Sequence, residues 1–248
     1  MRTIPDKLHE VGLKVKPSKC VLFKMEIQYL GHLVSVAGVN PMPEKIQVLR
    51  NWPTSHCLKD VRTFLGLASY YRKFVKGFAT IAETLTALTK RMVRFTWTPQ
   101  AQKAFETLKQ ALMDATSLEF PVTYLPCILD TNASEVAIGA VLSQKVDGEE
   151  CPIIFFSRVM NPAQKPYCTT RRELFAVISA LQHFRHYLIG NKVILRTDHY
   201  SLNWLKTFKI PEGIMACWIE TVLVHSNVDG VSRLFCNNGK GRSLRQNG

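Results

Sequence analysis

The chain of 248 residues is 46% hydrophobic, which allows a sizeable core and excludes the intrinsically disordered class. No stretch is long and apolar enough to span a membrane, and the charged start MRTIPDKLHE lacks the apolar run of a secretory signal, so we expect no membrane partner. Seven cysteines without a CxxC pair predict reduced thiols in an intracellular protein, cytoplasmic or nuclear, rather than a zinc site or a disulfide framework.

The formal net charge of +13 is unevenly distributed along the chain. Residues 1–120 hold 18 Lys and Arg against 9 Asp and Glu, whereas residues 121–248 hold 14 against 10. A basic first half predicts a polyanionic partner, most simply nucleic acid. A surface charge that only keeps the protein soluble is the alternative.

The first 40 residues are typical of the end of a helix followed by a hairpin. The segment KCVLFKMEIQYLGHLVSVAGVN is rich in β-branched and aromatic residues and is interrupted by Gly31 and Gly38. The next segment, PMPEKIQVLRNWP, predicts a short helix between prolines.

An amphipathic helix is predicted for SHCLKDVRTFLGLASYYRKFV. Its apolar stripe consists of Val61, Phe64, Leu65, Ala68, Tyr71 and Val75. Three cations, Arg62, Lys73 and Lys76, fall on another face. This face predicts either a surface that follows a phosphate backbone or a merely solvated one.

The segment FTWTPQAQKAFETLKQALMDA predicts a second long helix, with Thr98 as its N-cap and Pro99 in its first turn. The apolar residues at helical spacing are Ala104, Phe105, Leu108, Ala111 and Leu112. We assign this helix a structural role and no chemistry.

From about residue 120 the pattern changes to short strands. PCILDTNAS, AIGAVLSQ and CPIIFFSRV predict three consecutive strands, with a turn at the Asp-Gly pair of KVDGEE. TTRRELFAVISALQHFRHYLIG then predicts a long helix ended by Gly190, KVILRTD a fourth strand, and HYSLNWLKTF the start of another helix. This order predicts an α/β fold with a mixed sheet.

Acidic residues and one amide fall at strand ends and helix starts in this second half. Asp130 and Asn132 end the first strand and point to the same side, Glu173 begins the long helix, Asp198 ends the fourth strand, and Asp229 lies in HSNVDGVSRLF. Carboxylates gathered at one sheet edge repel one another unless divalent cations such as Mg²⁺ or Mn²⁺ hold them. Taken singly, the acids also suit a capping box in TRRE, an N-cap and a turn.

Nine segments follow one another along nearly the whole chain: LKVKPSKCVLF, YLGHLVS, LRNWPTS, VRTFLGLASYYRKFV, FTWTPQAQKAFETLKQAL, ILDTNASEVAIGAVLSQ, TTRRELFAVISALQHFRHYLIG, LRTDHYSLNWL and NVDGVSR. Together they resemble the reverse transcriptases of gypsy-type long-terminal-repeat retrotransposons. The resemblance implies a palm remnant at residues 1–40, a thumb-like helical region at 41–94, an RNase H-like domain of mixed sheet and flanking helices at 95–236, and a disordered basic tail at 237–248.

In this family the RNase H is an endonuclease that cleaves the RNA of RNA–DNA hybrids by two-metal hydrolysis. By resemblance, Glu173, Asp198 and Asp229 match three of the four acidic metal ligands, and Asn132 matches the fourth without its charge. Asp130 is a possible substitute ligand, although it lies roughly 6.6 Å back along the strand.

Three departures from the family pattern bear on activity. The fingers and most of the palm are absent, and no two aspartates are adjacent, so the polymerase motif is missing. The family has DTDAS where this chain has DTNAS. ACWIETVLVHSNVDG runs together two segments that a strand separates in the family, so we expect KVILRTD to have an open edge that promotes self-association.

The sequence therefore predicts a Pol polyprotein fragment with reverse transcriptase (transferase) and RNase H (hydrolase) ancestry. We expect it to bind RNA–DNA hybrid or duplex, in part through Arg62, Lys73 and Lys76, and to have weak or absent cleavage activity. A non-catalytic nucleic-acid-binding protein and a decayed open reading frame are the alternatives.

Overall fold

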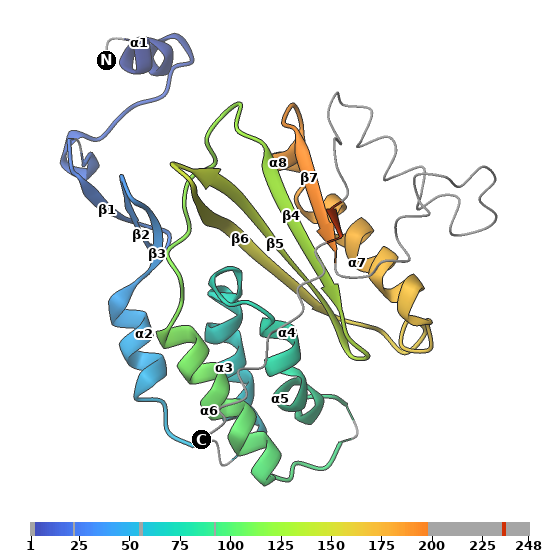
Figure 1. Cartoon of the computed structure of the whole chain (residues 1–248). Coiled ribbons are helices and arrows are strands. Elements are labelled where there is room, and N and C mark those ends of the chain that lie inside the picture. Colours follow the sequence, from blue (N-terminus) through green and yellow to red (C-terminus); the bar gives the residue numbers. More distant parts are fainter. Residues whose placement is uncertain (1–2, 22, 55–56, 92, 198–234, 237–248) are drawn as a thin grey trace, which may run out of the picture.

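The computed structural model of the chain describes residues 3–21, 23–54, 57–91, 93–197 and 235–236 (Figure 1). The elements of the first half are α1 (Thr3–Glu10), η1 (Pro17–Lys19), β1 (Glu26–Tyr29), β2 (His32–Ser35), β3 (Gly38–Pro41), α2 (Pro43–Arg50), α3 (Leu58–Tyr70), η2 (Arg72–Phe74), α4 (Phe78–Ile81), α5 (Glu83–Leu88) and α6 (Pro99–Met113). Those of the second half are β4 (Cys127–Ala133), β5 (Ala137–Val146), β6 (Glu149–Val159), α7 (Thr169–His183), α8 (Arg185–Leu188), β7 (Val193–Thr197) and β8 (Phe235–Cys236).

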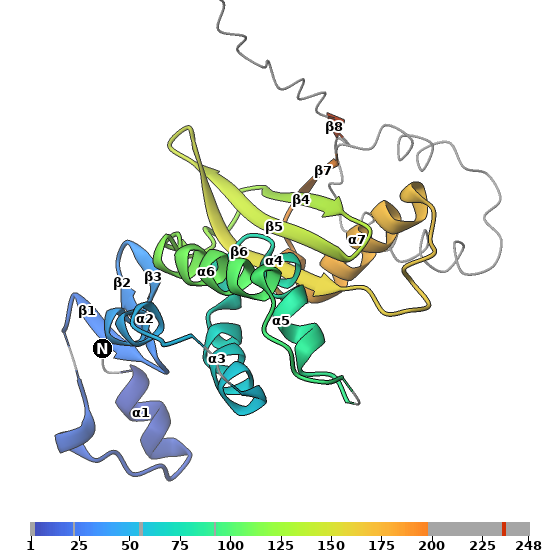
Figure 2. The same ribbon diagram turned by 90° about the horizontal axis from the view of Figure 1, so that it is seen from below.

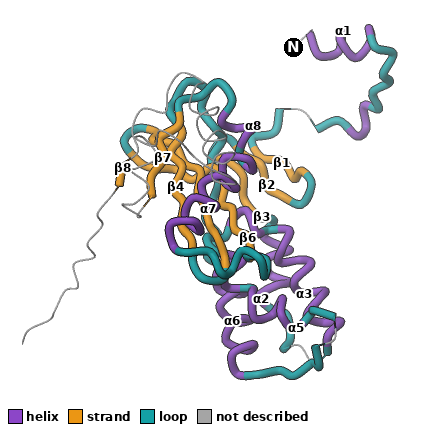
Figure 3. The backbone as a smooth tube through the Cα atoms, turned by 90° about the vertical axis from the view of Figure 1, so that its right-hand side faces the viewer, coloured by secondary structure: helices purple, strands orange, loops and turns teal. Residues whose placement is uncertain are grey.

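Strands β1, β2 and β3 form a small antiparallel sheet, so the expected hairpin is present and a third strand extends it. Gly38 has a φ of +128°, and a Cβ there would lie 2.3 Å from the carbonyl oxygen of Leu118. The missing side chain lets Val39 and Leu118 exchange two backbone hydrogen bonds of 2.7 and 3.0 Å. This contact joins the small sheet to the chain after α6. Helix α1 stands apart from the rest of the molecule (Figure 3).

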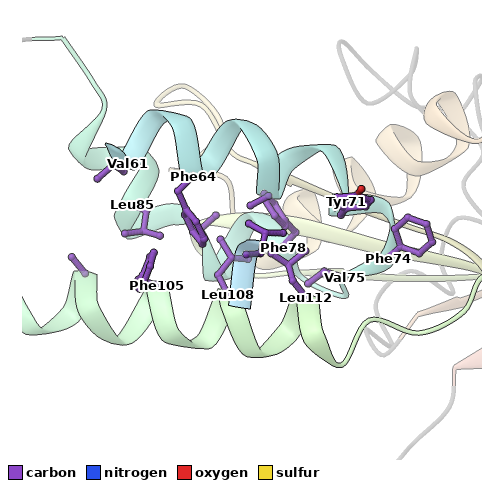
Figure 4. Packing of buried hydrophobic residues seen from close by; sticks show 14 of the residues in the cluster. Val61, Phe64, Tyr71, Phe74, Val75, Phe78, Leu85, Phe105, Leu108 and Leu112 are labelled. Carbon is purple, nitrogen blue, oxygen red and sulfur yellow. The ribbon is translucent and has the colours of Figure 1, made fainter. Parts of the chain in front are cut away.

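A first hydrophobic core lies between α3 and α6 and is shown in Figure 4. The predicted apolar stripe is buried there except for Leu65, which is partly buried. The predicted helix is too long, because α3 ends at Tyr70, and Tyr71 and Val75 of the stripe follow it. The rings of Phe64 and Phe105 meet with 4.6 Å between their centroids. As predicted, Thr98 is the N-cap of α6: its Oγ1 accepts a hydrogen bond of 3.2 Å from the amide of Ala101.

Helix α6 therefore packs in the core of the helical region, which consists of α2 to α6. The sequence analysis assigns this helix to the RNase H-like domain at 95–236. That domain boundary stays a prediction, whereas the packing of α6 with α2, α3, α4 and α5 follows from the shared core.

The second half forms a five-stranded sheet in the order β6-β5-β4-β7-β8. β4 pairs with β5 and β5 with β6 in antiparallel fashion, whereas β7 runs parallel to β4, so the predicted mixed sheet is confirmed. Asp147 and Gly148 both have positive φ, as the predicted Asp-Gly turn requires. The expected long helix breaks at Phe184 into α7 and α8, and Gly190 ends it with a φ of +80°.

The two faces of this sheet carry different neighbours (Figure 2). Leu129, Leu142 and the other buried residues of one face pack on α7 and form the second hydrophobic core. On the opposite face, α4 and η2 lie against β6. Among the described residues, no helix is long and apolar enough to cross a membrane.

The expected open edge of the fourth strand is only partly observed. β8 pairs with β7 at Arg196 and Thr197, so the expectation is wrong for these two residues. Within the part of the chain that the structure describes, Val193, Ile194 and Leu195 pair only with β4. The basic tail at 237–248 lies outside the described residues.

Candidate functional site

Asp130 and Asn132 share one face of β4, as their spacing predicts. Leu129 points to the face of the sheet that α7 covers and is fully buried. Asp130 and Asn132 point to the opposite face, where Asp130 is half-buried and Asn132 is exposed. Both residues line an open pocket of about 590 Å³. Its other wall is the segment that begins α4, with Lys76 and Thr80.

Asp130 is held by a forked ion pair with Arg196 of β7, which lies directly beside it in the parallel register. The Nε of Arg196 donates to one carboxylate oxygen at 2.6 Å and the Nη2 donates to the other at 2.5 Å. Arg196 also donates to both oxygens of Glu150, at 2.9 and 2.5 Å. These bonds raise the pKa of Arg196 above its ordinary value, chiefly through Asp130, and lower the pKa of Glu150. The use of Asp130 as a substitute metal ligand stays a prediction, and this ion pair counts against it because both oxygens are engaged.

Glu173 of α7 lies next to the end of β4. It is 4% exposed, and its Oε1 accepts a hydrogen bond of 3.1 Å from the amide of Ala133, the residue after Asn132. Helix α7 begins at Thr169 with Cys168 as N-cap, so the capping-box interpretation of TRRE is wrong: Glu173 lies inside the helix. The structure thus brings Glu173 to the strand end that carries Asn132.

The remaining predicted ligands, Asp198 and Asp229, lie outside the described residues. Strand β7 is described up to Thr197, which pairs with Thr131, the residue before Asn132. Among the described residues, no group of three or more His, Cys, Asp or Glu side chains could hold a metal ion. One carboxylate, from Glu173, and the neutral amide of Asn132 do not by themselves suit two divalent cations, which need several charged oxygen ligands.

The three cations predicted to bind nucleic acid lie in different surroundings. Lys76 is exposed and lines the pocket. Lys73 lies 5.2 Å from the ring centre of Phe74, and burial lowers its pKa. Arg62 on α3 donates to the carbonyl of Thr89 at 3.3 Å. Only Lys76 of the three lines the pocket beside Asn132.

Ser157 of β6 fixes the wall that carries Lys76. Its Oγ accepts a hydrogen bond of 2.9 Å from the amide of Ala79 in α4, and its carbonyl accepts one from Arg72. Sequence reasoning missed this residue and Arg196. A signal for Arg196 was present, because it is a cation near the end of an otherwise apolar strand.

Comparison with known families gives a match over residues 97–195. These residues match the family described as the RNase H-like domain found in reverse transcriptase. The match covers β4, β5, β6 and α7 and extends over most of β7, and so includes Asp130, Asn132 and Glu173.

Curated relatives are polyproteins of transposable elements. The retrovirus-related Pol polyprotein from transposon 412 of Drosophila melanogaster is 37% identical over 207 residues, which are 84% of this chain and 17% of that polyprotein. The transposon Tf2-3 polyprotein of Schizosaccharomyces pombe is 33% identical over 207 residues, 82% of this chain and 15% of that polyprotein. The chain thus spans less than a fifth of the length of these two relatives.

Solved structures of similar fold come from a foamy viral protease-reverse transcriptase. The complex with an RNA/DNA hybrid has a TM-score of 0.70 and 22% identity, and the match covers 91% of this chain and 32% of that chain. A complex of the dRH form with double-stranded DNA has a TM-score of 0.71 and 23% identity, over 89% of this chain and 39% of that chain. At this identity the match shows the fold. The RNase H-like fold predicted from the sequence is therefore confirmed, and the narrower resemblance to gypsy-type elements stays a prediction.

Proposed function

Residues 97–195 belong to the family of RNase H-like domains found in reverse transcriptases, and on this premise we propose that the chain, a fragment of a retrotransposon Pol polyprotein, binds RNA–DNA hybrid or duplex with little sequence preference. The observation that carries the proposal is the pocket that Lys76 and Asn132 line together. This pocket lies on the face of the sheet opposite α7, which we call the open sheet face. Phosphate contacts from lysine and polar side chains give affinity without reading bases.

Two further observations support nucleic acid as the partner. The first 120 residues, which supply Lys76, hold 18 Lys and Arg against 9 Asp and Glu and are therefore basic. Two structures of similar fold, both of a foamy viral protease-reverse transcriptase, are complexes with double-stranded DNA and with RNA/DNA hybrid. A cationic surface of this kind binds the backbone by releasing counterions.

Fluorescence anisotropy with labelled 20-base-pair hybrids of two unrelated sequences tests the proposal. We expect similar Kd values for both sequences and a linear rise of log Kd with log salt, because backbone contacts dominate. A Kd that is independent of salt, or a strong preference for one sequence, would contradict it.

We further propose that hydrolysis of the RNA strand by this chain is weak or absent. RNase H-like domains of reverse transcriptases use divalent cations, and Asn132 stands where the resemblance places a carboxylate ligand. An amide oxygen carries no charge and bridges two dications poorly. The loss of one such charge costs on the order of 10²–10³ in rate, by analogy with the loss of one oxyanion donor.

Hybrid cleavage in Mg²⁺ or Mn²⁺, measured for the wild type and Asn132→Asp, tests the catalytic proposal. We expect near-background cleavage for the wild type and a clear gain for Asn132→Asp. Robust wild-type cleavage that Asp130→Asn abolishes would show that Asp130 serves as the ligand. An inactive Asn132→Asp that still binds hybrid would instead favour the non-catalytic nucleic-acid-binding protein.

Self-association through the edge of β7 is a separate proposal. Val193, Ile194 and Leu195 are apolar and β-prone, and their pairing within the described residues is to β4 alone. Salt screens the repulsion between positively charged copies, so association should rise with salt. Size-exclusion chromatography across a salt series checks this, and a monomer at every salt concentration would overturn it.

A further inference from the structure

The pocket on the open sheet face has an unusual balance of charge. Three of the described residues that line it are charged, namely Lys76, Asp130 and Arg196. Arg196 is neutralised by Asp130 and by Glu150, as its four hydrogen bonds show. Lys76, by contrast, is exposed and has no ion-pair partner among the described residues. Lys76 is therefore the cation that remains available to an anion entering the pocket.

The residue at the floor of the pocket next to Asn132 has no side chain. Gly139 of β5 is the register partner of Asn132, and a Cβ built on Gly139 would meet only the carbonyl oxygen of Phe156, at 3.8 Å. The absent side chain leaves space above β5, directly beside the amide of Asn132. A pocket of about 590 Å³ has the size of a nucleotide-binding site rather than that of an ion site.

The side chain at position 132 decides whether a phosphate can enter without a metal. A carboxylate only accepts hydrogen bonds and repels phosphate, so it needs a cation between itself and the backbone. An amide carries two N–H donors and no charge, and it can donate directly to a phosphate oxygen or a sugar hydroxyl. Asn132 therefore suits direct contact with the backbone, with Lys76 supplying the charge from the opposite wall.

We propose that this pocket binds one sugar-phosphate unit of the nucleic-acid backbone directly, without a divalent cation, through Lys76 and the side-chain amide of Asn132. The inference rests on the proposed nucleic-acid binding and deepens it by naming the contact. It makes the site composite: Lys76 comes from the helical region, and Asn132 comes from the sheet. The hydrogen bonds of Ser157 to α4 and to Arg72 hold the two parts together.

The test compares affinity for double-stranded DNA, which has no RNA strand to cleave, in EDTA and in Mg²⁺ for four proteins. These are the wild type, Asn132→Asp, Lys76→Gln and, as a control, Lys103→Gln. Each variant lowers the net charge by one, so any general loss of electrostatic attraction to nucleic acid is the same in all three variants. Lys103 is exposed on α6 and does not line the pocket. Thermal melts of all four check that the variants are folded. We expect similar Tm values, because the three substituted side chains are exposed.

We expect the wild type to bind equally in EDTA and in Mg²⁺. Asn132→Asp should bind roughly tenfold more weakly in EDTA and recover in Mg²⁺, because the new carboxylate then requires a cation. Lys76→Gln should lose about tenfold in both buffers, and Lys103→Gln clearly less. Wild-type binding that EDTA abolishes, or losses in Lys76→Gln and Lys103→Gln that are equal, would overturn the inference but leave the proposed function standing. A wild type that binds neither double-stranded DNA nor hybrid would overturn both.

Discussion

The two faces of the five-stranded sheet differ in how they are covered. On one face, Leu129 and its neighbours are sealed by α7 in an apolar core. On the other, α4 and η2 lie against β6, and beside them a pocket remains open over β4 and β5. Neighbouring residues of β6 divide between the faces, since Phe155 packs with the helical core and Phe156 with the core under α7. The closed face should therefore determine stability, and the open face should determine binding.

The largest expected effect is on the closed face. Leu129→Ala removes a fully buried side chain and should lower the free energy of unfolding by about 2–5 kcal/mol. Val141→Ala on the open face is the comparison; it removes one carbon atom fewer and should cost clearly less still, because Val141 is only partly buried. Urea denaturation of both variants measures the difference. Equal losses would mean that the open face is packed as tightly as the closed one.

A smaller effect is expected where the helical region is joined to the open face. Ser157→Ala removes the acceptor of the buried amide of Ala79, and an unsatisfied buried donor costs about 1–3 kcal/mol. Because this bond also positions the wall that carries Lys76, hybrid affinity should fall as well. Ser69→Ala provides the control, because Ser69 is exposed on α3 and does not line the pocket. A loss of stability with unchanged hybrid affinity would show that the position of this wall does not affect binding.

The smallest effect concerns the ion pair at the edge of the pocket. The Arg196 hydrogen bond lowers the pKa of Glu150 below its ordinary value of 4.5, so the pair stabilises the fold above that pH. This contribution is lost as the pH falls further and Glu150 becomes protonated. Glu150 is 37% exposed, so the gain is about 0.2–1 kcal/mol.

Thermal melts between pH 3 and pH 7 compare the wild type with Glu150→Gln. The difference in Tm should vanish at the acid end of the series. A difference that persists there would assign the effect of the substitution to packing rather than to charge.

Much of this fold follows from local sequence signals. Asp147 and Gly148 specify their turn, Thr98 specifies the start of α6, and the apolar run Cys127–Leu129 indicates β4. The break between α7 and α8 had no such signal, because neither proline nor glycine occurs near Phe184. Periodicity also identifies the apolar face of α6 without identifying which core it enters.

The site was predictable only in part, for a related reason. The DTNAS segment located Asn132 at a strand end, and this prediction needed no tertiary information. The ion pair between Asp130 and Arg196 joins residues 66 positions apart and depends on the parallel register of β4 and β7. The approach of Lys76 to Asn132 depends on the contact of Ser157 with α4. Neither can be deduced from spacing along the chain.

Charge reversal on the two sides of the sheet tests the central claim most directly. Lys76→Glu lies at the open face, and Arg185→Glu lies on the exposed side of α8, which packs with the closed face; both change the net charge equally. At one fixed salt concentration, the Kd for hybrid should rise roughly tenfold more for Lys76→Glu than for Arg185→Glu. Equal losses, or a larger loss for Arg185→Glu, would contradict the assignment of nucleic-acid binding to the open face.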